Sequence, residues 1–494
     1  MGIAHGPVAA RLDAPRAFRD DGAMIDPWLT ASELSEAYRS RRLSPVEVSQ
    51  AALARIEALE PSLNAMVHVA GEATLEAARA SEARWRAGAP LSDLDGVPVT
   101  VKDNILVAGM PATWGSRVTG DASPEVDELP VARLREAGAV ILGKTNVPEF
   151  TLEGYTANAR FGVTRNPFDP RLTPGGSSGG SVASVAAAYS PLSLATDGGG
   201  SIRRPASHTG LVGLKPSTGR VPRLDGYPGI LLDCEVAGPI ARGVADLVLA
   251  DRILSSPDPR DAKARIARGG GGERPRRIAY LQRFPGQPLD PQIAASTDAA
   301  ASALEEIGCA IEPLVDLPFS IADLGPVWAM IGAVGVAHLR DHFGPERFDA
   351  LAGERFLTMA GEGARVPASA YLAGIERIAD FRRLVTEAFA RFDAILTPAA
   401  AALPWPADEP YPPFIDGQPV GPRGHAIYTG WVNLCGHPGL ALPATPSREG
   451  LPIGIQIVGR FGADEGLLAL AADYESARPW RHRRPWLDGD PAHG

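Results

Sequence analysis

The stretch PGGSSGGSVASVAAAYSPLSLATDGGGSIRRP, residues 174–205, holds two segments rich in glycine and serine. The first, residues 174–181, leads into a run of small residues that predicts a helix. The second, residues 196–203, follows LSLA, which is typical of a short buried strand. Glycine lets the backbone approach a ligand closely, and amides at the start of a helix favour negative charge. The stretch therefore predicts a site at which backbone amides meet a bound molecule.

Taken alone, the first segment fits several kinds of site. A phosphate loop is one interpretation, although the Gly-Lys-Ser/Thr ending is missing. Ser177 and Ser178 each satisfy the G-x-S-x-G pattern of a nucleophile elbow, but an elbow follows a strand, whereas residues 166–174 contain three prolines and predict a loop. In the second segment, a glycine run ending in Ser201 after a strand suits a nucleophile beside an oxyanion hole, with a tight turn as the alternative.

A lysine stands at the end of another predicted buried strand, in DGVPVTVKDN (95–104). An ammonium group is costly to bury. Lys102 therefore either reaches the surface and pairs with Asp103, or is a neutral, desolvated amine that acts as a base.

Helix-like segments alternate with short apolar strands along much of the chain. Thr30 with Glu33, and Ser44 with Glu47, form capping boxes that predict helix starts, and a further helix is expected over residues 72–86. The segments 134–144, 304–313 and 389–398 each indicate a helix end, a turn and a strand. This pattern predicts an α/β fold with a largely buried sheet in one large domain, residues 27–494, after a flexible tail over residues 1–26.

Composition excludes several classes of protein. Among 494 residues, 45% are hydrophobic and 21% charged, which excludes a mainly disordered chain. The net charge is −10, which repels phosphate backbones, so no nucleic-acid partner is expected. The uncharged run 324–339 is too short to span a bilayer; it predicts a buried helix or a pocket wall, and no membrane association is expected.

The three cysteines, Cys234, Cys309 and Cys435, lie far apart and form no CxxC pair. A disulfide framework or zinc site is therefore not expected, and no His/carboxylate cluster indicates another metal. Because residues 1–22 also lack an apolar signal segment, we expect a cytoplasmic protein.

Lys102, Ser177 and Ser201 follow one another with separations of 75 and 24 residues. In this order and context they resemble the amidase signature family of Ser–cisSer–Lys hydrolases. The resemblance covers about residues 28–487, with a divergent region near 255–430 that is expected to hold the substrate pocket. It extends to further blocks of sequence: GKTNVPEF (143–150), TRNPFDP (164–170), GLVGLKPSTGRV (210–221), GPIAR (238–242), GHPGLALPA (436–444) and GLPIGIQIVG (450–459).

The resemblance implies one α/β domain with a large mixed sheet covered by helices on both faces. It implies that Ser201 is the nucleophile, that Ser177 bridges after a cis peptide bond to Gly176, and that Lys102 is the terminal base. It further implies an oxyanion hole from the backbone amides around Gly198, Gly199, Gly200 and Ser201, support of the lysine by Ser178, and a loop braced by Asp197 and Arg203. Such a relay needs no histidine, metal or cofactor.

Aromatic residues of the divergent region predict an apolar pocket, and two more follow a family block. The candidates are Trp328, Trp405, Tyr411, Phe414 and Tyr428, with Phe150 and Tyr155. Such a lining suits a small-molecule amide, anilide or aryl carbamate, and a homodimer is left open. One alternative is the glutamine-hydrolysing subunit of a tRNA amidotransferase; such subunits more often have Gln where this chain has Arg204. The other is a non-catalytic nucleotide-binding protein.

Overall fold

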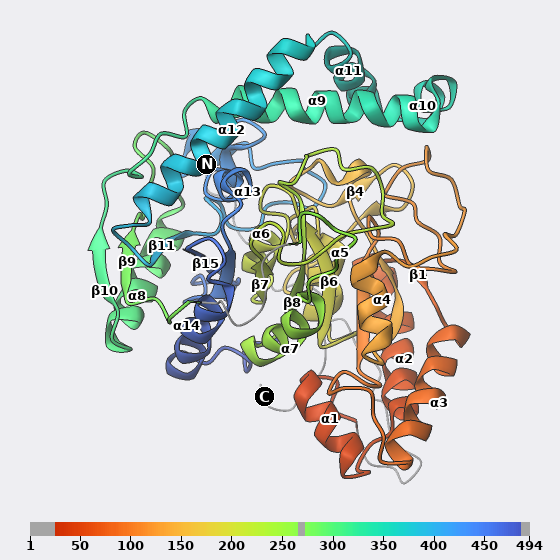
Figure 1. Cartoon of the computed structure of the whole chain (residues 1–494). Helices are drawn as coiled ribbons and strands as arrows, with labels where there is room; N and C mark the ends of the chain where they lie inside the picture. Colours follow the sequence, from red (N-terminus) through yellow and green to blue (C-terminus); the bar gives the residue numbers. More distant parts are fainter. Residues whose placement is uncertain (1–24, 265–271, 486–494) are drawn as a thin grey trace.

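An eleven-stranded mixed sheet crosses the molecule in the computed structural model, which describes residues 25–264 and 272–485 (Figure 1). β2 is parallel to both its neighbours, whereas the strands from β6 to β11 pair antiparallel. The predicted α/β fold with a mixed sheet is confirmed. In spatial order the strands are β1 (Met66–Val69), β3 (Val140–Thr145), β2 (Pro98–Lys102), β6 (Leu192–Asp197), β8 (Val236–Ala241), β7 (Val212–Lys215), β14 (Gly439–Pro443), β15 (Gly454–Gly459), β11 (Ala394–Pro398), β9 (Arg277–Tyr280) and β10 (Ala310–Pro313).

The described residues also form helices and two small hairpins. The hairpins are β4 (Ala157–Asn158) with β5 (Gly162–Val163), and β12 (Phe414–Ile415) with β13 (Gln418–Pro419). The helices are α1 (Ala31–Arg39), α2 (Pro45–Leu63), α3 (Glu72–Arg86), α4 (Leu129–Glu136), α5 (Gly179–Ala186), α6 (Arg203–His208), α7 (Val244–Leu254), α8 (Pro291–Glu306), α9 (Leu324–Phe343), α10 (Pro345–Leu351), α11 (Glu354–Gly363), α12 (Ala368–Ala388), α13 (Gly430–Cys435) and α14 (Asp464–Ala477), with short 3₁₀ turns η1 (Glu149–Thr151) and η2 (Gly424–Ala426).

Local sequence signals account for many of these boundaries. Both capping boxes are present, with the Thr30 and Ser44 hydroxyls accepting hydrogen bonds from the amides three residues on. The helix expected over residues 72–86 is α3, and the three helix–turn–strand segments are α4–β3, α8–β10 and α12–β11. These predictions are confirmed.

Helices cover both faces of the sheet, as the alternation of side chains along β6 shows. Leu194 packs into the cluster that includes Leu247 of α7. The next residue, Ala195, points to the other face and packs with Val182 of α5 and Ala206 of α6. The middle strands are therefore buried on both sides, and polar groups at their ends lie close to the core.

Helices α9 to α12 form a separate layer at one end of the molecule, opposite α1 to α3 (Figure 1). Val327 and Ile331 of α9, Phe356 of α11 and Ile378 of α12 share one buried cluster. The uncharged run 324–339 is thus the first four turns of α9, which confirms the predicted helix. Among the described helices, none is long and apolar enough to cross a membrane.

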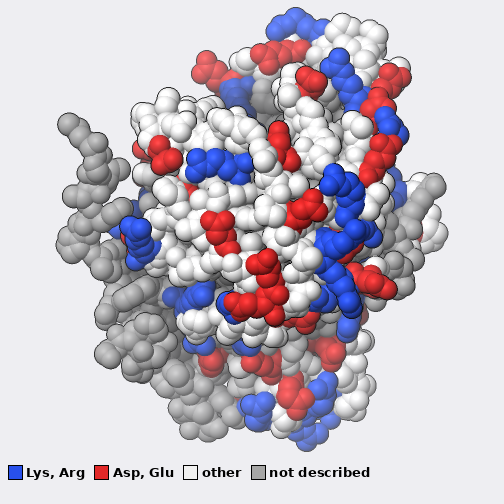
Figure 2. All heavy atoms as spheres, turned by 90° about the vertical axis from the view of Figure 1, so that its left-hand side faces the viewer, with Lys and Arg blue, Asp and Glu red and all other residues white. Residues whose placement is uncertain are grey.

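On the face shown in Figure 2, acidic side chains lie among the basic ones. Residues 1–24 of the predicted tail lie outside the described residues, and so do residues 486–494 at the end of the predicted domain. Of the two remaining tail residues, Ile25 is buried.

Candidate active site

Lys102 is the last residue of β2, and its side chain is fully buried. Its Nζ lies 2.9 Å from Ser177 Oγ, 3.0 Å from the carbonyl oxygen of Thr196 and 2.9 Å from Thr196 Oγ1. Asp103 turns away, and its carboxylate accepts a 3.1 Å hydrogen bond from Lys144 Nζ. The surface ion pair between Lys102 and Asp103, the alternative from the sequence, is therefore excluded.

The surroundings of Lys102 favour its neutral form. Burial lowers the pKa of Lys102 to about 7, although the negative charges of Glu235 and Asp197 act in the opposite direction. A neutral amine has two N–H groups and one lone pair. Donation to the carbonyl and the hydroxyl of Thr196 uses both N–H groups, which leaves the lone pair to accept the proton of the Ser177 hydroxyl. The geometry thus suits a base.

Ser177 lies in a tightly packed turn just before α5. The Gly176–Ser177 peptide bond is cis, as expected. A Cβ on Gly176 would lie 2.6 Å from the carbonyl oxygen of Tyr155, so only glycine fits beside that backbone. The Ser178 amide donates to the Ser201 carbonyl at 3.3 Å, which joins this turn to the second glycine segment.

Ser178 reaches the lysine only indirectly. Its hydroxyl donates to the Thr196 carbonyl at 3.2 Å, and that carbonyl also accepts from Lys102. The implied support of the lysine by Ser178 thus runs through a shared acceptor, since the Thr196 carbonyl accepts a hydrogen bond from each of the two side chains.

Ser201 stands in the turn between β6 and α6, and a buried ion pair holds this turn. The Asp197 carboxylate accepts from the amides of Gly200 at 2.7 Å and Ile202 at 3.1 Å, and pairs with Arg203 Nη2 at 2.9 Å. Burial alone would raise the pKa of Asp197, but the Arg203 guanidinium and the Asn433 amide outweigh it and hold that pKa well below its usual range. The geometry fits the expected bracing of the loop.

The expected oxyanion donors divide into two groups. The Gly200 amide already donates to Asp197, so in this structure it is not free to bind an oxyanion, contrary to the expectation from sequence. Within the described chain, the amides of Gly198, Gly199 and Ser201 have no protein acceptor. These three remain as donors for a developing negative charge.

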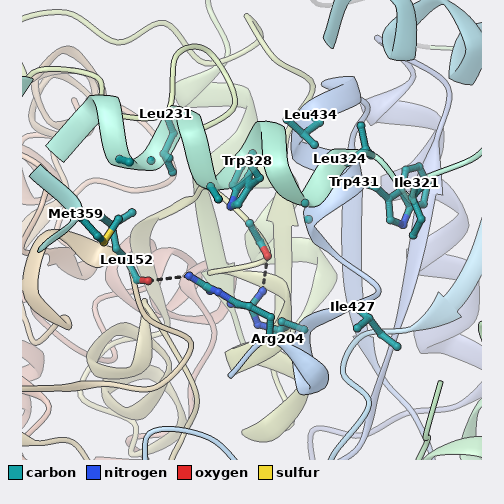
Figure 3. Close-up of a pocket in the computed structure, with 18 of the residues that line it drawn as sticks. Leu152, Arg204, Leu231, Ile321, Leu324, Trp328, Met359, Ile427, Trp431 and Leu434 are labelled. Carbon is teal, nitrogen blue, oxygen red and sulfur yellow. Dashed lines mark hydrogen bonds between the residues drawn. The ribbon is translucent and has the colours of Figure 1, made fainter. Parts of the chain in front are cut away.

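A cavity of about 580 Å³ opens beside this turn. Gly199 and Arg204 form part of its wall, and the Cζ2 atom of Trp328 is 3.4 Å from the position of a Cβ on Gly199. Figure 3 shows Trp328 pointing from α9 toward Arg204, with Leu152 and Met359 on one side and Ile427 on the other. The turn that carries Ser201 is thus connected to a mostly apolar cavity.

Comparisons with known proteins identify the family of this chain. The family model Amidase matches residues 47–468. The chain belongs to the amidase signature family. It is 35% identical to a glutamyl-tRNA(Gln) amidotransferase subunit from Symbiobacterium thermophilum over 93% of this chain and 99% of that protein.

Among solved structures it is similar to a bacterial aryl acylamidase of the amidase signature enzymes, with 30% identity, a TM-score of 0.86 and coverage of 94% of this chain and 99% of that one. A 6-aminohexanoate cyclic dimer hydrolase with bound substrate aligns with 28% identity, a TM-score of 0.82 and coverage of 94% and 100%.

The aromatic residues expected in the pocket of this amidase signature enzyme are scattered. Trp328 lines the cavity, and Tyr155 contributes its backbone to the packing of Gly176. The other five residues lie outside the cavity wall. Three are buried: Phe150 against Trp114, Phe348 and Phe356, Trp405 against His208 and His425, and Tyr428 against Phe284. Phe414 is largely exposed in the β12–β13 hairpin, and Tyr411 lies just before that hairpin.

Sequence reasoning missed several residues of the site. Thr196 supplies two of the three hydrogen-bond partners of Lys102. Its position just before Asp197, at the end of β6, was the feature of the sequence that could have indicated a place in the site. Trp431, from the same stretch as Tyr428, lines the cavity, as do Arg204, Arg355 and Arg423. In the described part of the chain, no cluster of three or more His, Cys, Asp or Glu residues could hold a metal ion.

Proposed function

We propose that this enzyme cleaves the C–N bond of a small or medium-sized amide, such as an aryl or alkyl amide, an anilide or a related carbamate, through an acyl-enzyme on Ser201. One observation carries the proposal. A buried lysine with a pKa lowered to about 7 is hydrogen-bonded to Ser177, whose turn is joined to that of Ser201. A serine hydroxyl is a poor nucleophile until a base takes its proton, and this pair supplies the base.

In acylation, Ser201 Oγ attacks the amide carbonyl carbon and forms the new C–O bond. Its proton passes to Ser177 Oγ while the Ser177 proton passes to Lys102 Nζ. The negative charge that develops on the carbonyl oxygen meets the unpaired amides of Gly198, Gly199 and Ser201. When the C–N bond breaks, Lys102 returns the proton through Ser177 to the leaving amine.

In deacylation a water molecule takes the place of the amine. It loses a proton to Lys102 through Ser177 and attacks the ester carbonyl. When the C–O bond to Ser201 breaks, Lys102 returns the proton through Ser177 to Ser201 Oγ, which releases the acid and restores the neutral lysine. Both half-reactions use the same three side chains, so the relay needs only Ser and Lys chemistry.

The cavity supports an apolar acyl or amine part of the substrate. Leu324, Trp328 and Gly332 are spaced four residues apart on α9 and present one helical face to it. Trp431 and Leu434 of α13 line it as well. An aromatic ring or alkyl chain buried there would contribute favourable transfer free energy. The similarity to an aryl acylamidase supports the same class of substrate.

The second candidate is a glutamine-hydrolysing amidotransferase subunit, favoured by the 35% identity to such a subunit over nearly the whole chain. Glutamine has a short, polar side chain that gains little from an apolar cavity of this size. Arg204, in place of the Gln more often found in those subunits, also lines that cavity. We therefore rank the amide hydrolase first.

Purified protein alone, incubated in parallel with 4-nitroacetanilide and with glutamine, distinguishes the two candidates. The amide hydrolase releases 4-nitroaniline, and intact mass spectrometry after rapid quenching detects the acyl group on Ser201. Release of ammonia from glutamine with no turnover of any anilide would reject the first proposal. A Ser201→Ala variant, identical in every other respect, is the matched control for contaminating hydrolases.

A further inference from the structure

Three arginines line the cavity beside the turn that carries Ser201. Arg204 comes from α6, Arg355 from α11, and Arg423 from the residue before η2, and all three line the cavity wall. The remaining wall is largely apolar, with Trp328 and Trp431 among its largest side chains. A cluster of cations beside an apolar wall is an unusual lining for a site that binds only neutral amides.

The three guanidinium groups differ in how far they are already paired. Arg355 forms an ion pair with Glu153. Arg204 is almost fully buried and donates to the carbonyl of Gly199, to Thr429 Oγ1 at 2.9 Å and to the Gly176 carbonyl at 3.3 Å, with its Nε left without an acceptor. Its positive charge is therefore bound by neutral groups only.

Arg423 is the least satisfied of the three. Its Nη2 donates to the Leu152 carbonyl at 2.9 Å, the dashed line that ends on Leu152 in Figure 3, and its side chain is exposed. Among the described residues, no carboxylate forms an ion pair with Arg423 or Arg204; Glu362 lines the same cavity but pairs with neither. Most of the N–H groups of Arg423 remain available to a ligand.

The arginines also act on one another. Burial and the charge of Arg423 together lower the pKa of Arg204 to about 9, and burial and the same charge lower the pKa of Arg355. Neighbouring cations repel one another, and this repulsion raises the free energy of their charged forms. An anion bound between them would offset the repulsion. The arginine-lined part of the cavity is thus electrostatically suited to a negative group.

On these grounds, and resting on the amide hydrolysis proposed above, we infer that the preferred substrate carries a carboxylate, which Arg423 binds with Arg204 behind it while Trp328 and Trp431 hold an apolar body. The planar fork of arginine matches the two oxygens of a carboxylate and can bind both at once. The substrate class is therefore an amide that keeps one free carboxylate. It is either an apolar amino acid acylated on its amino group or a dicarboxylic acid with one of its two carboxyl groups amidated.

The test compares matched pairs of substrates that differ only in charge. One pair is an N-acyl 4-aminobenzoate and the corresponding N-acyl 4-aminobenzamide; the other is the mono-4-nitroanilide of a dicarboxylic acid and its methyl ester. We expect the acid of at least one pair to have a kcat/KM about 10- to 100-fold above that of its neutral partner, the range for one charge-assisted hydrogen-bonded pair. This preference should shrink as salt is added, because Arg423, which binds the carboxylate, is exposed to solvent.

Arg423→Gln should remove most of this preference, and Arg423→Lys should keep part of it because the charge remains while the fork is lost. Arg79→Gln on α3, an exposed arginine paired with Glu72, removes the same charge far from the cavity and should leave the acid-to-neutral ratio unchanged.

Two results would overturn the inference without touching the proposed function: hydrolysis of neutral amides with no preference for either acid, or an acid preference that Arg423→Gln leaves intact. Failure of the wild-type enzyme to hydrolyse any member of either pair would instead count against amide hydrolysis itself. The preference is measured on the wild-type enzyme first, so a variant that fails to fold does not decide the matter.

Discussion

Removal of the Glu235 charge should lower the pH at which the enzyme becomes active. Lys102 must be neutral to accept a proton, and its pKa is about 7. Below that value the neutral fraction falls about tenfold for each pH unit, so kcat/KM should fall by the same factor. Glu235 raises this pKa through its negative charge. Glu235→Gln keeps the shape of the side chain and removes that charge.

The hydrogen-bonded chain from Lys102 through Thr196 and Asn104 to Glu235 has links of 2.9, 3.0 and 3.4 Å, so the two charges lie no more than about 9 Å apart. At an effective dielectric constant near 20, one charge at that distance corresponds to about one pKa unit. The midpoint of the acid limb should therefore move from about pH 7 to about pH 6. The Arg223 charge, which stays in place, lowers the same pKa and acts in the same direction.

The measurement is kcat/KM for an uncharged anilide from about pH 5 to about pH 9 at constant ionic strength, with Glu72→Gln on the surface of α3 as the control of equal charge. A midpoint that stays unchanged in Glu235→Gln, or that moves upward, would refute the role of Lys102 as the base. Lys102→Arg should be almost inactive at every pH, because a guanidinium stays protonated.

Three further substitutions test the relay and the cavity. Ser177→Ala should cost about 10²- to 10⁴-fold in kcat/KM on an alkyl amide and clearly less on a 4-nitroanilide, whose leaving group needs less proton delivery; equal losses on both would contradict proton transfer through Ser177. Thr196→Val should lower kcat about tenfold, since Lys102 loses a hydrogen-bond acceptor while the carbonyl stays; unchanged kcat with a lowered melting temperature would make Thr196 merely structural. Trp328→Ala should raise KM for aryl amides about tenfold and leave acetamide little affected, and a uniform change in both would place Trp328 outside the substrate contact.

The parts of the fold that follow local rules were predictable. A capping box depends on side chains three residues apart, and α1 and α2 begin where theirs predicted. The β-branched run that ends at Lys102 was recognisable as a buried strand for the same reason, because the strand is only five residues long, whereas the sequence left open whether Lys102 itself is buried or pairs with Asp103 at the surface. Such signals lie within one turn or one strand and need no knowledge of the tertiary structure.

Thr196 was missed because its role depends on which strands are neighbours. β2 and β6 pair in parallel, with Val101 opposite Leu194. The residues at the carboxyl ends of the two strands, Lys102 and Thr196, therefore lie at the same edge of the sheet. Strands β2 and β6 are nearly a hundred residues apart in the sequence, and nothing local specifies this pairing.

The pocket residues were missed for a related reason. Tyr428 and Trp431 stand three residues apart in the sequence, yet Tyr428 packs on Phe284 in the core while Trp431 lines the cavity. Which of two aromatic residues faces a cavity depends on the tertiary packing around them, and here Trp431 shares the cavity wall with Leu324 and Trp328 of α9. Composition identified the segment and could not choose between its members.

In the proposed mechanism, chemistry and specificity come from different parts of the chain. Lys102, Ser177 and Ser201 stand at the ends of central strands and at the start of helices that are buried on all sides, where a displaced backbone would disturb the whole core. Much of the cavity wall comes instead from α9 and α11 in the outer helical layer, which lies at one end of the molecule. Substitutions along the face of Leu324, Trp328 and Gly332 can therefore change which amide fits while leaving the relay in place. This arrangement explains why Lys102, Ser177 and Ser201 were recognisable in the sequence, whereas the lining of the cavity depends on the tertiary structure.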